Sequence, residues 1–181
     1  SRRARWGPWP PAGVPRCVVG SGAGSGVRGS RHVIAIDTNL LVYAHRSDSE
    51  WNERAYACLG AVAGGAAAWA IPWPCIHEFF AITTHPRIYD PPSTVAEALA
   101  QVDAWLASPT VVLLAEHDHY WPSLRHLIEG SRVTGSRVHD ARIATLCVSH
   151  GVRELWSADR DFSRFSALRV RNPLTEPSPG P

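Results

Sequence analysis

Val33-Ile-Ala-Ile-Asp-Thr-Asn39 is the stretch that decides the fold, because it sets a short apolar run directly before an acid. An apolar run of this length, bounded by polar residues, is typical of a buried strand. Similar runs recur along the chain and predict strands at 33–36, 67–71, 111–115, 154–157 and 168–171. The sequence is therefore organised around short, buried strands.

Helical patterns fill the segments between these strands. Capping boxes predict two helix starts, at Ser47-x-x-Glu50 and Thr94-x-x-Glu97. A third helix is predicted from residue 120 to a stop at Gly130, and a fourth over 139–150 with Gly151 as its C-terminal cap. A further helix should follow the second strand. Strands that alternate with helices predict an α/β fold, with a parallel sheet covered on both faces.

Length and composition fit one globular domain, or two at most, since domains have about 100 to 200 residues and the chain has 181. Hydrophobic residues make up 45% and charged residues 19%, which excludes a disordered chain. No apolar run approaches the roughly 18 residues of a membrane span. The four cysteines form no C-x-x-C pair, so we expect reduced thiols in a cytoplasmic protein without membrane contact.

The net charge of +2 divides unevenly along the chain. Residues 1–32 carry six arginines and no acid, whereas residues 33–181 carry 12 arginines and 16 acids, a balance of −4. The chain contains no lysine, so arginine supplies all of this positive charge. The segment that holds the strands is mildly acidic, which excludes a protein that binds nucleic acid through bulk positive charge alone.

Residues 1–32 are rich in Gly, Pro, Ser and Arg and show no strand or helix period, so we expect them to be disordered. An alternative is that this segment precedes the true start of translation, with Val33 at a non-standard initiation codon. Its glycines at 24, 26 and 29 match G-x-G-x-x-G but precede a strand, whereas a dinucleotide site follows one. The folded domain is expected to span 33–174, with a flexible tail at 175–181.

Acidic side chains occur where the predicted strands end and the helices begin. Asp37 and Asp159 follow the first and fourth strands. Glu78 is expected in the opening turn of the helix after the second strand, and Asp140 at the start of the helix over 139–150. The carboxyl ends of parallel strands share one edge of the sheet, and ligands bind there. We therefore expect these four side chains to converge on one crevice.

Four carboxylates in one partly buried crevice raise one another's pKa, and a divalent cation relieves this repulsion. Mg²⁺ and Mn²⁺ prefer carboxylate oxygens, together with water and phosphate oxygens. A cation bound there would support hydrolysis of a phosphodiester. The four acids are thus candidate catalytic residues and metal ligands, although each one alone is as well explained as a helix cap or a dipole partner.

Three more polar residues near these acids have two interpretations each. Asn39 either forms the turn after the first strand or holds a metal ligand through a hydrogen bond. Ser157 either ends its strand or orients Asp159. Asp161 either caps the short helix that follows or replaces Asp159 as the fourth acid. Capping is the preferred role of Asp161, because Asp159 comes first after the strand.

Other catalytic patterns are incomplete. His77-Glu78 lacks the second histidine of an H-E-x-x-H zinc motif, since residue 81 is alanine. His117-Asp118-His119 has no partner at ligand spacing and is interpreted as a polar loop. No G-x-S-x-G elbow or P-loop occurs in the sequence.

Several segments together resemble PIN-domain ribonucleases, specifically the VapC toxins of bacterial toxin–antitoxin modules. They are Val33-Ile-Ala-Ile-Asp-Thr-Asn39, Pro74-Cys-Ile-His-Glu-Phe79, Val138-His-Asp-Ala-Arg-Ile-Ala144 and Leu155-Trp-Ser-Ala-Asp-Arg-Asp-Phe162, and Thr84-His-Pro-Arg-Ile-Tyr89 resembles a loop of one VapC subgroup. The resemblance covers about residues 33 to 174. It implies a three-layer fold whose parallel five-stranded sheet has the order 3-2-1-4-5.

The same resemblance implies a Mg²⁺- or Mn²⁺-dependent endoribonuclease, usually a homodimer, that a VapB antitoxin inhibits. Asp37, Glu78, Asp140 and Asp159 match the acidic quartet of the family, and Asn39 and Ser157 match its polar neighbours. The long N-terminal segment departs from the family pattern, in which chains begin just before the first strand. This departure favours the later translation start at Val33.

RNA cleavage is the leading hypothesis, and arginines around the acidic crevice must then hold the RNA. The candidates for this role are Arg46, Arg87, Arg142 and Arg160. Alternatives are a metal-dependent phosphatase or DNA nuclease on the same fold, and a non-catalytic RNA-binding scaffold. The presence of all four acids argues against the scaffold.

Overall fold

The computed structural model describes residues 33–175. The predictions made for residues 1–32 and 176–181, including disorder at both ends, lie outside the described residues, as does Cys17.

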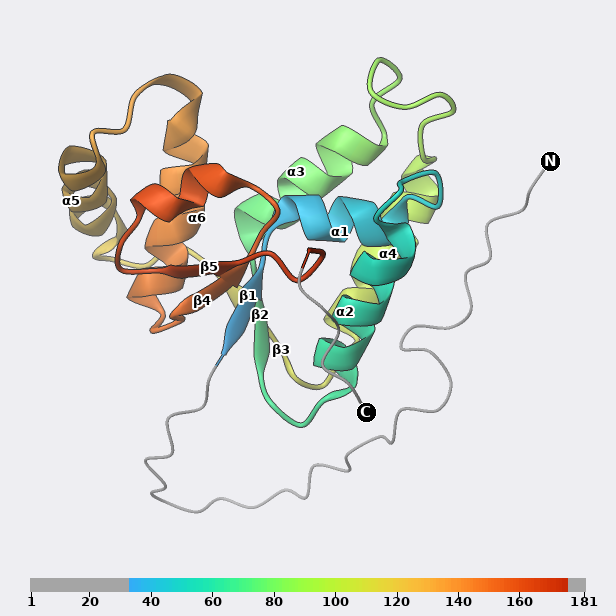
Figure 1. The fold of residues 1–181 in the computed structure, drawn as a ribbon, viewed down its shortest axis with the longest axis horizontal. Coiled ribbons are helices and arrows are strands. Elements are labelled where there is room, and N and C mark those ends of the chain that lie inside the picture. Colours follow the sequence, from blue (N-terminus) through green and yellow to red (C-terminus); the bar gives the residue numbers. More distant parts are fainter. Residues whose placement is uncertain (1–32, 176–181) are drawn as a thin grey trace.

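Five parallel strands form one sheet in the order β3-β2-β1-β4-β5, as the resemblance implied (Figure 1). β1 lies at the centre and pairs with β2 on one side and β4 on the other. Each strand overlaps a run that the sequence predicts. The strands are Ile34–Ile36 (β1), Trp69–Pro72 (β2), Val111–Leu114 (β3), Glu154–Trp156 (β4) and Arg169–Arg171 (β5).

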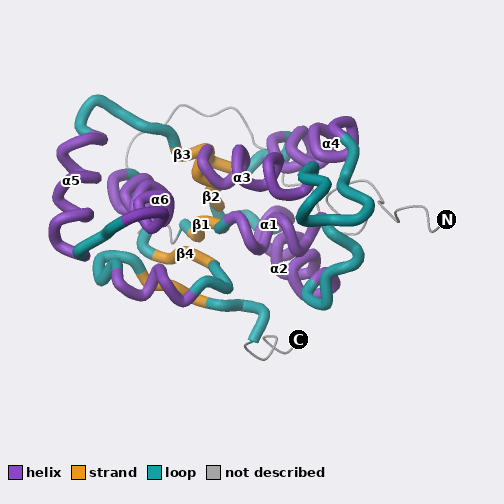
Figure 2. The backbone as a smooth tube through the Cα atoms, turned by 90° about the horizontal axis from the view of Figure 1, so that it is seen from above, coloured by secondary structure: helices purple, strands orange, loops and turns teal. Residues whose placement is uncertain are grey.

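Helices cover both faces of this sheet, which gives the predicted three layers (Figure 2). α1 to α4, which connect β1 to β2 and β2 to β3, lie on one side, and α5 and α6, which lead back to β4, lie on the other. Right-handed crossovers require this, because the chain reverses its direction across the sheet between β3 and β4. The helices are Thr38–His45 (α1), Asn52–Gly64 (α2), Trp73–Thr83 (α3), Val95–Leu106 (α4), Tyr120–Ser131 (α5) and Val138–Ser149 (α6), with 3₁₀ helices Gly135–Arg137 (η1) and Arg160–Arg164 (η2).

One of the two predicted capping boxes is confirmed. Thr94 Oγ1 accepts a hydrogen bond from the Glu97 backbone, and the Glu97 carboxylate accepts one from the Thr94 backbone. The box at Ser47 is wrong, because α2 begins only at Asn52 and no side chain caps it. Instead, Asn52 Nδ2 donates to the carbonyls of Tyr43 and Ala44, so a contact with the end of α1 fixes where α2 starts.

Left-handed residues follow the ends of α5 and α6. Gly130 does not stop α5, because the helix continues to Ser131 and Arg132 adopts the left-handed conformation with φ 50°. Gly151, with φ 73°, follows the last residues of α6 as predicted. A residue without a Cβ suits this position, since a left-handed backbone is strained for most side chains.

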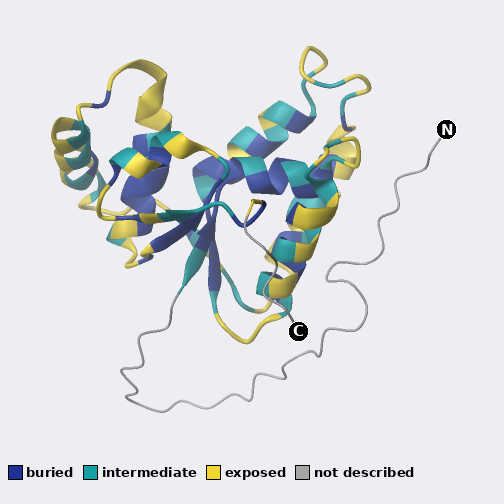
Figure 3. Ribbon diagram, viewed as in Figure 1, coloured by how far each residue is buried: buried dark blue, intermediate teal, exposed yellow. Residues whose placement is uncertain are grey.

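The core lies between the sheet and its helices. β1, β2 and β4 are buried along most of their length, whereas the edge strands β3 and β5 are largely intermediate or exposed (Figure 3). Phe79 of α3 meets Trp105 of α4 edge to face, with ring centroids 4.7 Å apart. Burial of such large side chains contributes about 1.5 to 3 kcal/mol each, so α3 and α4 are firmly fixed against each other. Cys58, Cys75 and Cys147 are free thiols, as predicted. Every helix within residues 33–175 falls short of the length and apolarity of a membrane span.

Candidate active site

Asp37 lies at the carboxyl end of β1 and is the N-cap of α1. Its backbone is extended and its Oδ1 accepts a hydrogen bond from the Thr38 backbone at 2.7 Å. Its own N–H donates to the carbonyl of Trp156 in β4, which joins the two central strands at this edge. The residue is only 4% exposed. Asp37 is therefore both a helix cap and a buried acid at the predicted place.

Hydrogen bonds from three directions hold the Asp37 carboxylate. Its Oδ2 accepts from Asn39 Nδ2 at 2.7 Å and from Ser157 Oγ at 2.6 Å. Asn39 also donates to Ser157 Oγ and accepts from the Ala158 backbone. Asn39 thus belongs to α1 and not to a turn, and it ties the start of that helix to the end of β4. Ser157 Oγ also accepts from the Asp159 backbone at 2.9 Å, so it contacts both acids.

The pKa of Asp37 is raised from its ordinary value of 3.8 to about 6. Burial is the main cause, and the negative charges of Glu78 and Asp159 add to it. Hydrogen bonds from Ser157 and Thr38 oppose the rise, because they favour the ionised form. At neutral pH the buried carboxylate is ionised at a cost that a cation would relieve.

This shift predicts a pH dependence of stability in EDTA. Because the folded chain holds the Asp37 proton more tightly than the unfolded chain, its contribution to stability is full below about pH 4 and is lost as pH rises to about 6. The loss amounts to about 3 kcal/mol in the free energy of unfolding. Urea unfolding of wild type and Asp37→Asn across this range should show the difference between them changing with pH. A constant difference would contradict the shift.

Ser157→Ala should weaken the site, since Ser157 is 1% exposed and donates the shortest hydrogen bond to Asp37. Its loss leaves the carboxylate less well oriented and raises the pKa of Asp37 further. We expect cleavage of RNA to fall about 10- to 100-fold and the unfolding free energy to fall by about 1 to 3 kcal/mol. Steady-state cleavage and urea unfolding measure the two effects, and Ser157→Thr tests whether a hydroxyl suffices. Full activity of Ser157→Ala would show that this hydroxyl does not orient Asp37.

Glu78 lies in the second turn of α3 and not in its opening turn, because the helix already begins at Trp73. The carboxylate still reaches the site, where its Oε2 accepts a hydrogen bond from Thr38 Oγ1 at 2.7 Å. Thr38 is a residue of the candidate site that sequence reasoning missed. Its position directly after Asp37 was the available signal, since the first residue of α1 must lie beside the acid that caps it.

Asp140 lies in the first turn of α6, as predicted, and is partly buried. Its pKa is raised by burial first, and then by the charges of Asp159, Asp161 and Glu78, while Arg164 opposes the rise. The acids after β2 and β4 thus act on a carboxylate from the opposite helical layer. Glu78 and Asp159 therefore both act on Asp37 and on Asp140.

Asp159, and not Asp161, caps the short helix that follows β4. Asp159 is the N-cap of η2, with its Oδ1 accepting from the Asp161 backbone at 2.8 Å. The prediction that Asp161 caps this helix is wrong, because Asp159 already has the extended backbone of a cap. Asp161 lies in the first turn, where its carboxylate pairs with Arg137 and Arg164.

The four acids lie at the same edge of the sheet but do not form a complete metal-binding site. Within residues 33–175, no three His, Cys, Asp or Glu side chains are already arranged to hold a cation, and this includes the three neighbouring histidines 117, 119 and 150. The donor set of the acids nevertheless fits Mg²⁺ or Mn²⁺, because it consists of carboxylate oxygens whose charges repel one another. Coordination of a cation would require these side chains to move from their present positions.

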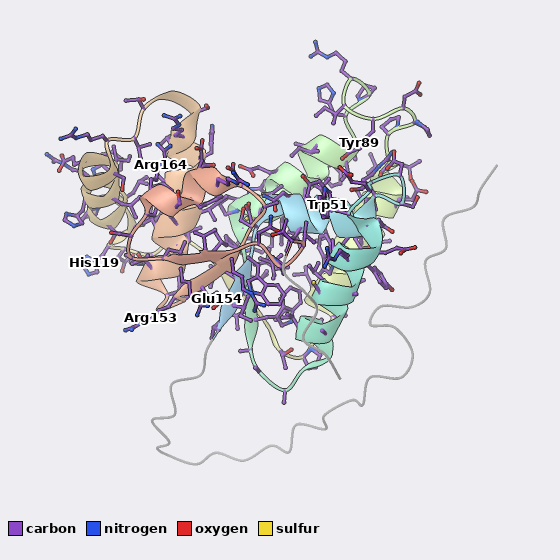
Figure 4. The ribbon with its side chains drawn as sticks, viewed as in Figure 1. Trp51, Tyr89, His119, Arg153, Glu154 and Arg164 are labelled. Carbon is purple, nitrogen blue, oxygen red and sulfur yellow. The ribbon has the colours of Figure 1, made fainter. Side chains whose placement is uncertain are left out.

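Two of the four candidate RNA-binding arginines are engaged elsewhere. The Arg46 guanidinium lies 4.0 Å from the ring centroid of Tyr89 and pairs with Asp48. Tyr89 lies in the loop between α3 and α4 (Figure 4). Arg142 pairs with Glu116. Arg87 and Arg160 are exposed and make no salt bridge within residues 33–175.

A cavity of about 440 Å³ lies between α5, α6 and η2. Its lining includes His126, Thr145, Arg164 and Phe165, but none of the four acids. The cavity is therefore not the place where the acidic cluster would meet a substrate.

Comparison with known proteins places this geometry in a family. The family model for the PIN domain matches residues 34–168. Ribonuclease VapC43 of Mycobacterium tuberculosis is 31% identical over 142 residues, which cover 78% of this chain and 96% of that protein. Ribonuclease VapC48 of the same organism is 27% identical over 139 residues, covering 77% and 96% respectively.

Solved structures agree with this assignment at the level of the fold. VapBC2 from Rickettsia felis, bound to a DNA fragment from its promoter, gives a TM-score of 0.55 at 18% identity and covers 77% of this chain and 98% of that one. VapC20 of Mycobacterium tuberculosis, a toxin that cleaves the sarcin-ricin loop, gives 0.52 at 15% identity, covering 72% and 92%. The chain belongs to the PIN-domain family, and within it to the VapC ribonucleases.

Proposed function

We propose that this chain is the toxin of a VapB–VapC pair and cleaves RNA phosphodiesters as a Mg²⁺- or Mn²⁺-dependent endoribonuclease. One observation carries the proposal. Asp37 is a buried carboxylate at the carboxyl end of the central strand, oriented by Asn39 and Ser157 and repelled by Glu78 and Asp159. An acid held in this costly state suits a site that binds a hard cation.

The four acids of the candidate site and their polar neighbours each have a role in this proposal. Asp37, Glu78, Asp140 and Asp159 would hold the cation, which when bound polarises the phosphate and lowers the pKa of attacking water. Asn39 and Ser157 fix the rotamer of Asp37, and Thr38 fixes that of Glu78. Asp161, with its two arginine partners, stands outside this set.

The partners follow from relatives and from the surface. The solved VapBC complexes of related fold support a VapB-type antitoxin as the inhibitor of this chain in the cytoplasm. We also propose a homodimer. Protein contacts of either kind need apolar surface, and α4 exposes Val95, Leu99 and Leu106 along one face.

The test of this function is cleavage of RNA by the purified full chain with Mg²⁺, Mn²⁺ or EDTA. We expect cleavage with either cation, none in EDTA, and none by Asp140→Asn, which keeps the shape of the side chain and removes its charge. Denaturing gels of labelled RNA would show internal cuts. Cleavage that persists in EDTA, or in purified Asp140→Asn, would overturn the proposed metal-dependent mechanism.

A further inference from the structure

Asp161 holds two arginines at once. Its Oδ2 lies 3.6 Å from Arg137 Nε, and its Oδ1 lies 3.4 Å from an Arg164 terminal nitrogen. Arg164 Nε also donates to the backbone carbonyl of Asp161 at 2.9 Å. We call Arg137 and Arg164 the arginine pair. They come from η1 and η2, which are far apart in the sequence, so the fold itself brings them to one carboxylate.

The arginine pair retains positive charge and donors after these contacts. Two guanidinium groups share one carboxylate, which leaves a net charge of +1, and no other acid lies within salt-bridge distance of either group among the described residues. The side chains are 49% and 23% exposed. Each guanidinium has five N–H donors in a geometry that matches phosphate, and these contacts use only a few of them.

The other arginine salt bridges within residues 33–175 lack this surplus. Each combines one cation with one acid: Arg46 with Asp48, Arg125 with Glu129, Arg142 with Glu116 and Arg169 with Glu154. Such pairs are neutral overall and attract a polyanion weakly. Arg137, Asp161 and Arg164 differ from these salt bridges because they combine two cations with one acid.

The arginine pair lies beside the acidic cluster. The charges of Arg164 and Asp161 both act on Asp140, and Arg137 is the N-cap residue of the helix that carries Asp140. The Asp161 backbone donates to Asp159. Figure 4 shows Arg164 on η2, next to α6. A strand of RNA whose scissile phosphate reached Asp140 and Asp159 would place a neighbouring phosphate near this pair.

We propose that Arg137 and Arg164, positioned by Asp161, bind a backbone phosphate of single-stranded RNA adjacent to the scissile bond. The inference rests on the proposed function, since it assumes RNA as the substrate. The four carboxylates repel the RNA polyanion that must approach them, and a phosphate contact with the two arginines would offset this repulsion. The contact is independent of base identity, so it sets affinity and register and leaves sequence preference to other residues.

Salt dependence distinguishes a phosphate contact from a structural role. Each phosphate neutralised on single-stranded nucleic acid contributes about 0.7 to the slope of log affinity against log salt. Arg137→Gln and Arg164→Gln should each weaken RNA binding about three- to tenfold and make this slope shallower. Arg164→Lys keeps the charge and should retain the slope, with weaker binding because lysine lacks the planar fork.

The experiment measures fluorescence anisotropy of a short labelled single-stranded RNA with the full-length Asp140→Asn chain in Mg²⁺, across a salt series. The arginine variants are added to this chain. Arg125→Gln is the matched control, since it removes an exposed, paired arginine on α5 and should leave affinity and slope unchanged. Thermal unfolding of every variant reports any loss of structure.

The possible outcomes separate the two proposals. An unchanged slope in Arg137→Gln and Arg164→Gln overturns the phosphate contact, whether or not their melting temperature falls. Equal losses in Arg125→Gln also overturn it, because bulk charge would then explain the binding. Cleavage of the probe by the Asp140→Asn chain would instead contradict the metal-site assignment, while the arginine measurements can be repeated at low temperature with intact RNA.

Discussion

Asp37→Asn is expected to reduce RNA cleavage by more than about a hundredfold, because loss of even an outer partner of a metal ligand costs 10- to 100-fold. The substitution keeps the size of the side chain and an oxygen that can accept from Thr38. It removes the charge at the centre of the cluster, where Ser157 and Asn39 orient it. The deficit should appear in the maximal rate at saturating metal as well as in the metal concentration required.

The fold should survive this substitution. In EDTA the variant lacks the buried charge whose repulsion and desolvation raise the pKa of Asp37, and this favours its folded state. Its new amide N–H group, however, faces the N–H donor of Asn39, and this disfavours the folded state. These effects oppose each other, so the unfolding free energy at neutral pH should change by only about 1 kcal/mol. Mn²⁺ should raise the melting temperature of wild type, since a ligand stabilises the state that binds it, and should not raise that of Asp37→Asn.

Asp103→Asn provides the control for Asp37→Asn, because Asp103 is exposed on α4 and makes no salt bridge within residues 33–175. We expect wild-type cleavage and the same Mn²⁺ stabilisation in this variant. A wild-type cleavage rate in Asp37→Asn, or an unchanged melting shift with Mn²⁺, would remove Asp37 from the proposed metal site.

The sequence predicts the positions of these acids in the fold well where geometry depends on topology alone. Parallel strands have their carboxyl ends at one edge, so Asp37 and Asp159 were placed correctly from the apolar runs before them. Asp140 followed from the helix start before β4. The order of the strands came from the family resemblance, because short buried strands carry no register signal of their own.

Prediction failed where a contact between distant segments decides the local structure. A capping box at Ser47 is plausible from sequence, but Asn52 binds the end of α1 and sets the start of α2 there. Glu78 reaches the site from the second turn of α3 through Thr38, a partner 40 residues away. The arginines present the same problem, since sequence cannot show that Arg46 is held by a loop after α3 whereas Arg137 and Arg164 share one acid.

Asp159 and Asp161 provide the second test of large effect. Asp159 both caps η2 and contributes its charge to Asp37 and Asp140. Asn is as good an N-cap as Asp, so Asp159→Asn removes the charge and keeps the cap. We expect cleavage to fall by more than about a hundredfold, by the same reasoning as for Asp37, with little change in melting temperature. Asp159→Ala should lose the same activity and also about 1 kcal/mol of stability.

Asp161→Asn should behave differently, because this carboxylate orients the arginine pair and does not hold the cation. The half-maximal Mn²⁺ concentration should match wild type, and cleavage should fall less than about tenfold, through poorer positioning of RNA. Metal titrations of cleavage for both variants decide between the two acids. If Asp161→Asn needs far more Mn²⁺ while Asp159→Asn does not, Asp161 is the fourth ligand and the arginines must part from it when the cation binds.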